Sequence, residues 1–344
     1  MNLYEENELF YKYEKLWEAN TKSHYDLSFI KSFLESKYLK KNSSQDADGN
    51  IVISSGDRNK ICFCAHMDTV FKSNPYPIYD NNKGIITSIN QYGIGGDDKC
   101  GIIISIELLK FCVINNISCK VVLFSTEESG GVGAKEIDLK VFDDVSHIVE
   151  VDRKGYNEVI RISGSTDLCN EDYIKEFSDF KIEYGIFTDV NILKSRGLNK
   201  NCVNISAGYY SPHGDKEYVS TQDMTDIIYK LRNFSIKTTG KVYKDHVYIK
   251  QNIGNQGHFW HNYSIDDYEE YYRYDNCKSV GKYKDNVCDN CGKSEIELGE
   301  EFKFNPDFYC LLCSKCSKEL IEDFYEEYED ISEKDDSILA IYHI

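Results

Sequence analysis

The chain has 344 residues, a formal charge of −18 at pH 7 and 13 cysteines. This length is enough for one large domain plus a small one, or for two medium-sized domains. Because 58 acidic residues outnumber 40 basic ones, the surface would repel phosphate backbones and anionic lipids, so neither nucleic acid nor a membrane is expected as a partner. No secretory signal or membrane-spanning run is visible, and a cytoplasmic location is expected.

Hydrophobic periodicity predicts strands that alternate with helices. Residues 1–40 have apolar side chains at three- and four-residue steps, which is typical of helices. Strand-like apolar runs follow at residues 50–54, 60–65, 85–89, 120–125, 147–151, 159–163 and 202–206. Helices are predicted at residues 98–115, 170–178 and 221–234. This alternation, with several strands apolar throughout, predicts an α/β fold: a mostly parallel mixed sheet flanked by helices on both faces.

The periodic pattern fades after residue 237. We therefore divide the chain into an α/β domain at 1–237, a polar connector at 238–285, a cysteine-rich module at 286–328 and an acidic tail at 329–344. Seven cysteines are scattered through the apolar segments of the first domain, where small buried thiols in a reducing compartment are expected.

The cysteine-rich module has the spacing of a structural zinc site. Its two C-x2-C pairs, 18 residues apart, are Cys288 with Cys291 and Cys310 with Cys313. Four thiolates at this spacing complete a closed tetrahedral shell. Cys316 forms another C-x2-C with Cys313, so the fourth ligand stays open. With a hairpin strand predicted at 301–304 and a helix after the second pair, the module resembles a treble-clef or LIM-like zinc finger. Its acidic helix favours a structural or protein-docking role.

Metal-ligating residue types follow the predicted strands of the first domain in five places. Loops at strand ends are where an open α/β sheet assembles its sites. His66 and Asp68 lie two residues apart at the end of an apolar strand, so they face the same side. His66 can bind a metal ion through one ring nitrogen while Asp68 orients the ring. For this motif alone, a pair that only hydrogen-bonds the next loop is an equally good interpretation.

The next two places supply carboxylates. Asp97 follows a glycine-rich run and precedes a long predicted helix, where a carboxylate can bridge two cations. For Asp98, a helix N-cap is a sufficient explanation. Glu127 and Glu128 are adjacent after another apolar strand, so their side chains diverge. One can bind metal while the other takes a proton from a water molecule that zinc has acidified to a pKa of about 7.

Together these stretches resemble the co-catalytic zinc exopeptidases, which include aminopeptidases, tripeptidase T and carboxypeptidase and deacylase relatives. The likeness spans about residues 25–235. It rests on HMDTV at 66–70, GGDDKCG at 95–101, STEESGG at 125–131, VEVD at 149–152 and YYSPHG at 209–214. The fold that it implies is the zinc exopeptidase fold, which is phosphorylase/hydrolase-like.

The resemblance also implies a role for each matching residue. The metal ligands would be His66 and Asp152 for one zinc ion, Glu128 and His213 for the other, and Asp97 as the bridge between them. Glu127 would be the general base, and Asp68 would support His66. The peptide bond between Asp97 and Asp98 would be cis, as is common in the family.

One departure from the tripeptidase and deacylase pattern concerns the lid. Those enzymes insert a lid or dimerisation domain between the positions of Asp152 and His213, but here only about sixty residues separate the two. Predicted core elements fill this gap, so we expect a lidless, single-domain member closer in layout to the aminopeptidases. Asp189 would lie near the substrate pocket, either to meet a substrate α-ammonium or as a helix N-cap. Tyr209 and Tyr210 are candidates for stabilising an oxyanion, or packed aromatics.

Three functions are therefore compared. The first is a di-zinc exopeptidase of the aminopeptidase type, and the second is an amidohydrolase that acts on N-acyl amino acids. The third is an inactive scaffold that works through its finger, which the complete ligand set disfavours. Zn²⁺ is the expected cofactor, with two catalytic ions and one structural ion, and Co²⁺ or Mn²⁺ are alternatives at the catalytic site. The expected partners are a peptide or N-acyl amino-acid substrate and, through the C-terminal module, another protein.

Overall fold

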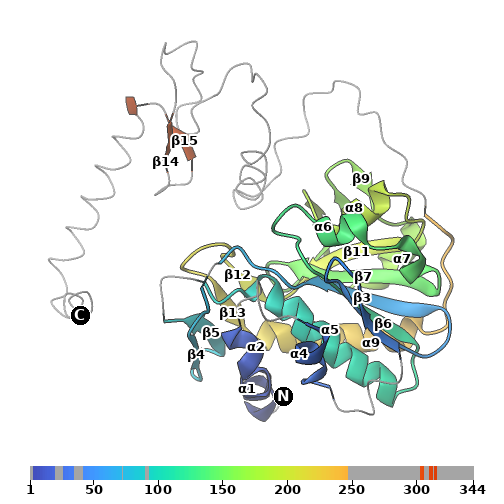
Figure 1. The fold of residues 1–344 in the computed structure, drawn as a ribbon, viewed down its shortest axis with the longest axis horizontal. Coiled ribbons are helices and arrows are strands. Elements are labelled where there is room, and N and C mark those ends of the chain that lie inside the picture. Colours follow the sequence, from blue (N-terminus) through green and yellow to red (C-terminus); the bar gives the residue numbers. More distant parts are fainter. Residues whose placement is uncertain are drawn as a thin grey trace, which may run out of the picture. The chain divides into compact units, whose positions relative to one another are not determined.

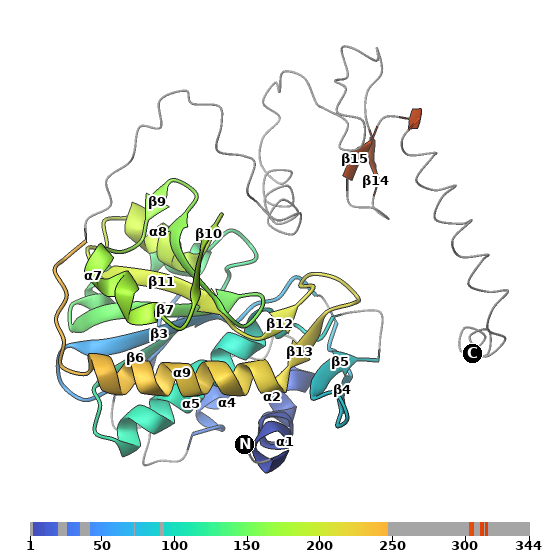
Figure 2. The same ribbon diagram turned by 180° about the vertical axis from the view of Figure 1, so that it is seen from behind.

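The computed structural model describes residues 3–19, 26–34, 42–71, 73–89, 93–246, 303–305, 310–312 and 314–315. Contacts divide the chain into two units, Met1–Tyr263 and Ser264–Ile344. The first unit is a layered α/β structure (Figure 1; Figure 2 from behind).

A nine-stranded mixed sheet forms the centre of the first unit. Its strands are β1 (Asn42–Gln45), β2 (Ile51–Ser55), β3 (Lys60–His66), β6 (Cys119–Phe124), β7 (Val145–Arg153), β8 (Glu158–Ser163), β9 (Thr166–Asp167), β10 (Lys181–Gly185) and β11 (Asn201–Ser206). Their order is β1-β2-β6-β3-β7-β11-β8-β10, with β9 beside β8. The four central strands β6, β3, β7 and β11 are parallel, whereas β2 and β8 run antiparallel to their inner neighbours. This arrangement confirms the predicted fold class.

Helices cover both faces of the sheet (Figure 1). On one face lie α5 (Gly96–Ile114) and α9 (Thr221–Thr238), with the N-terminal helices α1 (Leu3–Lys12), α2 (Glu14–Glu18) and α4 (Leu27–Lys31) on the same side. On the other lie α6 (Val132–Glu136) and α8 (Asp189–Ser195). The described residues also form three short helical turns: η1 (Leu139–Phe142), α7 (Glu171–Ile174) and η2 (Lys175–Phe177).

Helix α5 is buried almost around its whole circumference. Its run Ile102, Ile103 and Ile104 is fully buried, although β-branched residues have modest helix propensity. Burial between the sheet and α9 therefore outweighs local preference here. This helix matters for the site because Asp97 lies at its start, where the backbone departs from helical φ and ψ.

A second, smaller sheet has the order β12-β13-β5-β4 and is antiparallel throughout. It contains β4 (Pro77–Asp80), β5 (Ile85–Ser88), β12 (Tyr209–Tyr210) and β13 (Tyr218–Ser220). The predicted strand at 85–89 thus exists, but it belongs to this sheet and not to the parallel one. The reason is local, because a tight turn that ends at Gly84, with a φ of 64°, folds β5 back on β4.

The contacts of the first unit continue past residue 237. Helix α9 ends at Thr238. The carbonyl of Lys241 then accepts a hydrogen bond from Ser146 Oγ at 2.7 Å, and the N–H of His246 donates to the carbonyl of Asn199 at 2.8 Å. Residues 241–246 therefore pack on the α/β domain, while the predicted domain division as a whole stays a prediction.

The described part of the second unit is a hairpin of β14 (Lys303–Asn305) and β15 (Cys310–Leu312). It agrees with the hairpin strand predicted near this position. Cys288, Cys291, Cys313 and Cys316 lie outside the described residues, and Cys310 is described only by its backbone position in β15. The zinc finger therefore stays a prediction.

Two further expectations concern the cysteines and membranes. The seven cysteines of the α/β domain are all buried and free, as predicted: Cys62, Cys64, Cys100, Cys112, Cys119, Cys169 and Cys202. Within the described ranges, no helix is both long and apolar enough to cross a bilayer.

Candidate metal centre

The candidate ligands gather where the central strands end. Strands β6, β3 and β7 are parallel neighbours, so their carboxyl ends meet at one edge of the sheet. His66 is the last residue of β3, Glu127 and Glu128 follow β6, and Asp152 lies near the end of β7. Two more ligands reach this edge from other elements. Asp97 comes from the first turn of α5 and His213 from the loop after β12.

Asp97 lies between the two histidines. Its Oδ1 is 2.9 Å from Nε2 of His66, and its Oδ2 is 3.1 Å from Nε2 of His213. Each carboxylate oxygen therefore faces a different imidazole. This is the layout that a carboxylate shared by two cations requires. Asp97 is buried, and the Asp97–Asp98 peptide bond is cis, as the resemblance implied.

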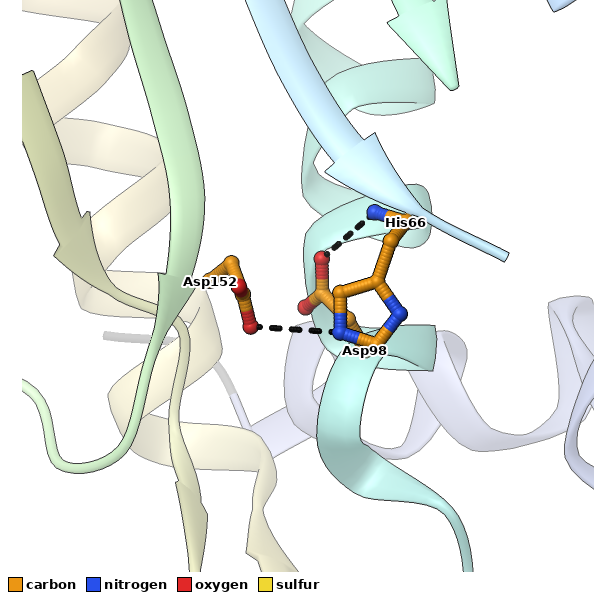
Figure 3. A group of neighbouring side chains, drawn as sticks. All are labelled: His66, Asp98 and Asp152. Carbon is orange, nitrogen blue, oxygen red and sulfur yellow. Dashed lines mark hydrogen bonds and ion pairs between the residues drawn. The ribbon is translucent and has the colours of Figure 1, made fainter. Parts of the chain in front are cut away.

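One set of donors surrounds His66. Among the described residues, ligand atoms of His66, Asp98 and Asp152 all lie within 4.8 Å of one another. Nε2 of His66 is 3.5 Å from Oδ1 of Asp152 (Figure 3). Asp98 differs from Asp152, because its Oδ2 accepts the backbone N–H of His66 at 3.2 Å and its Oδ1 that of Gly101 at 2.9 Å. Both oxygens of Asp98 are thus occupied in joining the end of β3 to the start of α5.

The other set of donors surrounds His213. Nε2 of His213 is 2.8 Å from Oε1 of Glu128 and 3.1 Å from Oδ2 of Asp97. One ring nitrogen thus faces two carboxylates, although it has only one proton to share between them. A cation placed among His213, Glu128 and Asp97 would satisfy both. Imidazole nitrogens and carboxylate oxygens are common zinc ligands, so the residues present fit a pair of such ions.

The carboxylate of Asp68 contacts two residues, His66 and Glu127. Its Oδ1 is 3.4 Å from Nδ1 of His66 and accepts the backbone N–H of Glu127 at 2.8 Å. Asp68 therefore lies beside the His66 ring, and its role in supporting that ring stays a prediction. The second contact, to the loop that carries Glu127, was not foreseen.

Asn50 is another residue that the sequence analysis missed. Its side chain binds the two ends of the loop that contains Glu127 and Glu128. Its Oδ1 accepts the N–H of Ser125 at 3.2 Å, and its Nδ2 donates to the carbonyl of Gly133 at 3.1 Å. The available signal was the turn-forming run DADGN at 46–50, whose asparagine is fully buried.

Crowded carboxylates and buried imidazoles shift one another's pKa values. Burial alone would raise the pKa of Asp97, but hydrogen bonds with His213 and His66 outweigh it and hold that pKa well below its usual range. Burial would lower the pKa of His66, and the negative charge of Asp152 outweighs it, so the pKa is raised. Burial raises the pKa of Glu127, and Asp152, Glu128 and Asp189 raise it further. Such a concentration of negative charge favours bound cations.

The candidate substrate residues have different positions. Tyr209 is buried and its hydroxyl donates to Oδ1 of Asp152 at 3.2 Å, so it touches the cluster. The hydroxyl of Tyr210 instead donates to Asp223 at 2.6 Å, and its ring stacks on Tyr218. The structure does not bring Tyr210 to the ligands.

Asp189 is the first residue of α8, and the N-cap position belongs to Thr188. The Asp189 side chain is 1% exposed, and neither of its oxygens has a hydrogen-bond partner. Burial raises its pKa; the positive charge of His66 opposes this, and the carboxylates of Asp152 and Asp68 reinforce it. An orphaned carboxylate at this place is a candidate contact for a cationic group.

Comparisons with known proteins find similar structures but no similar sequence. No protein-family model matches the chain, and no curated protein sequence matches it. The solved structures that resemble it include three peptidases. One is a tripeptidase from Staphylococcus aureus, with a TM-score of 0.53 and 15% identity over 67% of this chain and 97% of that chain. The others are aminopeptidase PepT from Bacillus cereus (0.54, 14%, 68% and 98%) and an aminopeptidase from the archaeon Desulfurococcus kamchatkensis (0.51, 12%, 68% and 96%). The chain has the fold of these peptidases. At such low identity the likeness establishes the fold alone.

Proposed function

We propose that this protein is a metal-dependent exopeptidase of the aminopeptidase type, with two divalent cations held on either side of Asp97. The observation that carries the proposal is the position of Asp97, whose two oxygens approach the Nε2 atoms of His66 and His213 at 2.9 and 3.1 Å. Zinc is the proposed ion, with Co²⁺ or Mn²⁺ as alternatives.

Each ligand has a distinct place in the proposal. His66 and Asp152 would hold one ion, Glu128 and His213 the other, and Asp97 would be shared. A bound pair of such ions would lower the pKa of a water molecule and polarise the scissile carbonyl. Tyr209 would orient Asp152 through its hydrogen bond of 3.2 Å.

Glu127 would be the general base. It follows the same strand as Glu128, and its backbone N–H donates to Asp68. Its carboxylate would then lie beside the ligands without being one of them. It would accept the proton of the attacking water and pass it to the leaving amine.

Two observations favour an aminopeptidase over an amidohydrolase. The stretch between Asp152 and His213 forms β8, β9, α7, η2, β10, α8, β11 and β12, so it is filled by core elements and not by an inserted lid domain. Asp189 supplies a buried carboxylate without a hydrogen-bond partner. Under the proposal, it would accept the α-ammonium group of the substrate.

A panel of dipeptides tests the proposal. The purified full-length protein is loaded with zinc and assayed on free, N-acetylated and C-amidated dipeptides, with Asp97→Asn as the metal-site control. We expect cleavage of the free and C-amidated peptides, little cleavage of the N-acetylated one and no activity in the control. Preferred cleavage of N-acyl substrates would identify an amidohydrolase instead. A metal-loaded protein that cleaves none of them would contradict both enzymatic functions and favour a scaffold.

A further inference from the structure

The loop after β12 carries a buried acidic side chain, Glu217, besides the histidine of the site. This loop connects Tyr210 to Tyr218 and contains both His213 and Glu217. His213 has a φ of 66°, a left-handed conformation that residues other than glycine adopt rarely. Residues in such conformations persist where surrounding contacts determine them. The loop therefore needs an anchor near His213.

Glu217 makes that anchor across the site. Its Oε2 accepts the backbone N–H of Gly95 at 2.6 Å, and its Oε1 accepts that of Asp97 at 3.2 Å. The side chain is 2% exposed. Hydrogen bonds from backbone amides to a buried carboxylate are among the strong ones, so this side chain ties the loop of His213 to the loop of Asp97.

The glycines of the Asp97 loop make room for this carboxylate. A Cβ added to Gly93 would lie 2.4 Å from Oε2 of Glu217, and one added to Gly96 would lie 3.4 Å from Oε1. Real Cβ atoms essentially never approach within 3.0 Å of another heavy atom. The positions of Glu217 and of the Phe71 ring, also 2.4 Å from that Cβ, thus both require glycine at residue 93.

The same loop is held from its other side by Lys99. This buried ammonium group donates to the carbonyls of Ile94 and Trp17, both at 2.8 Å. Glu217 therefore does not close the loop alone, because Lys99 already fixes its fold against the N-terminal helices. What Glu217 adds is the link to His213.

We propose that Glu217 is a positioning residue that fixes the spacing between Asp97 and His213 by binding the backbone of one loop from the other. The inference rests on the proposed function, because that spacing matters only if the two residues share an ion. Glu217 touches neither ion nor substrate in this account. Outer contacts of this kind typically change metal affinity or activity by about 10- to 100-fold.

Glu217→Gln is the decisive variant, because it keeps one acceptor oxygen but presents an NH₂ group to the other backbone N–H. The matched control is Glu107→Gln. Glu107 is also a buried carboxylate, but its partners include Tyr13, Lys110 and Lys12, far along α5 from the ligands. Both variants are compared with the full-length protein for unfolding, for stepwise Zn²⁺ affinity, for the absorption spectrum with Co²⁺, and for kcat and KM on the best dipeptide.

We expect Glu217→Gln to remain folded, to bind one of its two catalytic ions about 10- to 100-fold more weakly, and to lose kcat with little change in KM. The Co²⁺ spectrum should also change. Glu107→Gln should lower stability alone. If Glu217→Gln binds both ions within about twofold of the wild-type affinity and shows the wild-type spectrum, the positioning role is wrong.

Amide hydrogen exchange gives a readout that needs neither metal nor activity. The N–H groups of Gly95 and Asp97 should exchange at least about tenfold faster in Glu217→Ala, while amides in α9 stay protected. Gly93→Ala offers a second route, because its new Cβ would lie 2.4 Å from the carboxylate, and Phe71→Ala/Gly93→Ala removes the equal clash with the Phe71 ring. Unchanged protection of Gly95 and Asp97 in folded variants would overturn the inference. A wild-type protein that binds two ions but cleaves no peptide would contradict only the proposed function.

Discussion

The carboxylate of Asp68 accepts a hydrogen bond from the backbone N–H of Glu127 at 2.8 Å. The two residues are 59 positions apart in the chain and belong to loops after neighbouring parallel strands, β3 and β6. Asp68 thus contacts both His66, a candidate metal ligand, and Glu127, the proposed general base. The contact makes Asp68 more important than a support for His66 alone.

Replacement of Asp68 should therefore have two separable effects. Asp68→Ala loses the contact to His66 and the hydrogen bond to Glu127, and should lower kcat/KM by about 100-fold or more. Asp68→Asn keeps an oxygen for Glu127 but loses the charge beside His66, so a smaller loss is expected. Steady-state kinetics with zinc analysis checks this order. Equal activity losses in the two variants would argue against the bond to Glu127.

The neighbours Glu127 and Glu128 should behave differently when each is changed to glutamine. Glu127→Gln should lower kcat by about 10²- to 10⁴-fold with near-normal zinc content, because it removes a proton acceptor and no ligand. Glu128→Gln should lose zinc as well as activity. Metal analysis of both purified variants decides the assignment. A Glu127→Gln protein that keeps most of its rate would show that another group is the base.

Removal of the metal ions should destabilise the first unit. Without cations the buried carboxylates of Asp97, Glu128 and Asp152 repel one another, and a ligand that binds only the folded state adds about 4 kcal/mol at a thousand times its Kd. Thermal unfolding with and without a chelator should show this loss, with recovery on adding Zn²⁺. In Asp97→Asn the chelator should have much less effect. An equal shift in both proteins would place the stabilising ion elsewhere.

His147 should make stability depend on pH. It is fully buried beside Tyr173, Phe234 and Tyr243, and burial lowers its pKa from 6.5 to about 3. Below pH 6.5 His147 is protonated in the unfolded chain but stays neutral in the folded chain. Its contribution is therefore complete above pH 6.5 and is lost as the pH falls toward 3, at about 1.4 kcal/mol per pH unit.

The comparison with His147→Phe isolates this effect. Denaturant unfolding is measured for both proteins between pH 7 and 4, and the difference in free energy of unfolding is plotted against pH. The wild type should lose stability relative to the variant as the pH falls. A difference that does not depend on pH would mean that His147 takes up its proton in the folded state.

Truncation tests the predicted zinc finger and the domain boundary together. A chain that ends at His246 keeps the contacts of residues 241–246 with Ser146 and Asn199 and should fold, keep peptidase activity and contain one zinc ion fewer than the full chain. A chain that ends at Lys237 loses those contacts and should unfold at a lower temperature. Equal zinc content in the full-length protein and the His246 truncation would refute the finger.

The sequence by itself determined the positions of the central strands and the list of candidate metal ligands. Apolar runs predicted β2, β3, β6, β7, β8 and β11 because central strands and their helices have clear local periods. His66, Asp97, Glu128, Asp152 and His213 could be nominated because each has a residue type suited to a metal and a place at a strand end or beside a glycine-rich turn. The edge strands β1 and β10 are short and polar, so no run of apolar residues predicts them.

Only the tertiary structure decided which of these groups meet. Ile86 pairs with Val219 of β13, 133 residues later, which no local period reveals. Tyr209 and Tyr210 are adjacent in sequence, yet one hydroxyl meets Asp152 and the other Asp223, because successive side chains of a strand point to opposite faces. Asn50 and Glu217 bind backbone amides 75 and 122 residues away. Such contacts depend on how loops approach one another across the edge of the sheet. The residue type, glutamate or asparagine, does not by itself reveal which distant amide the side chain binds.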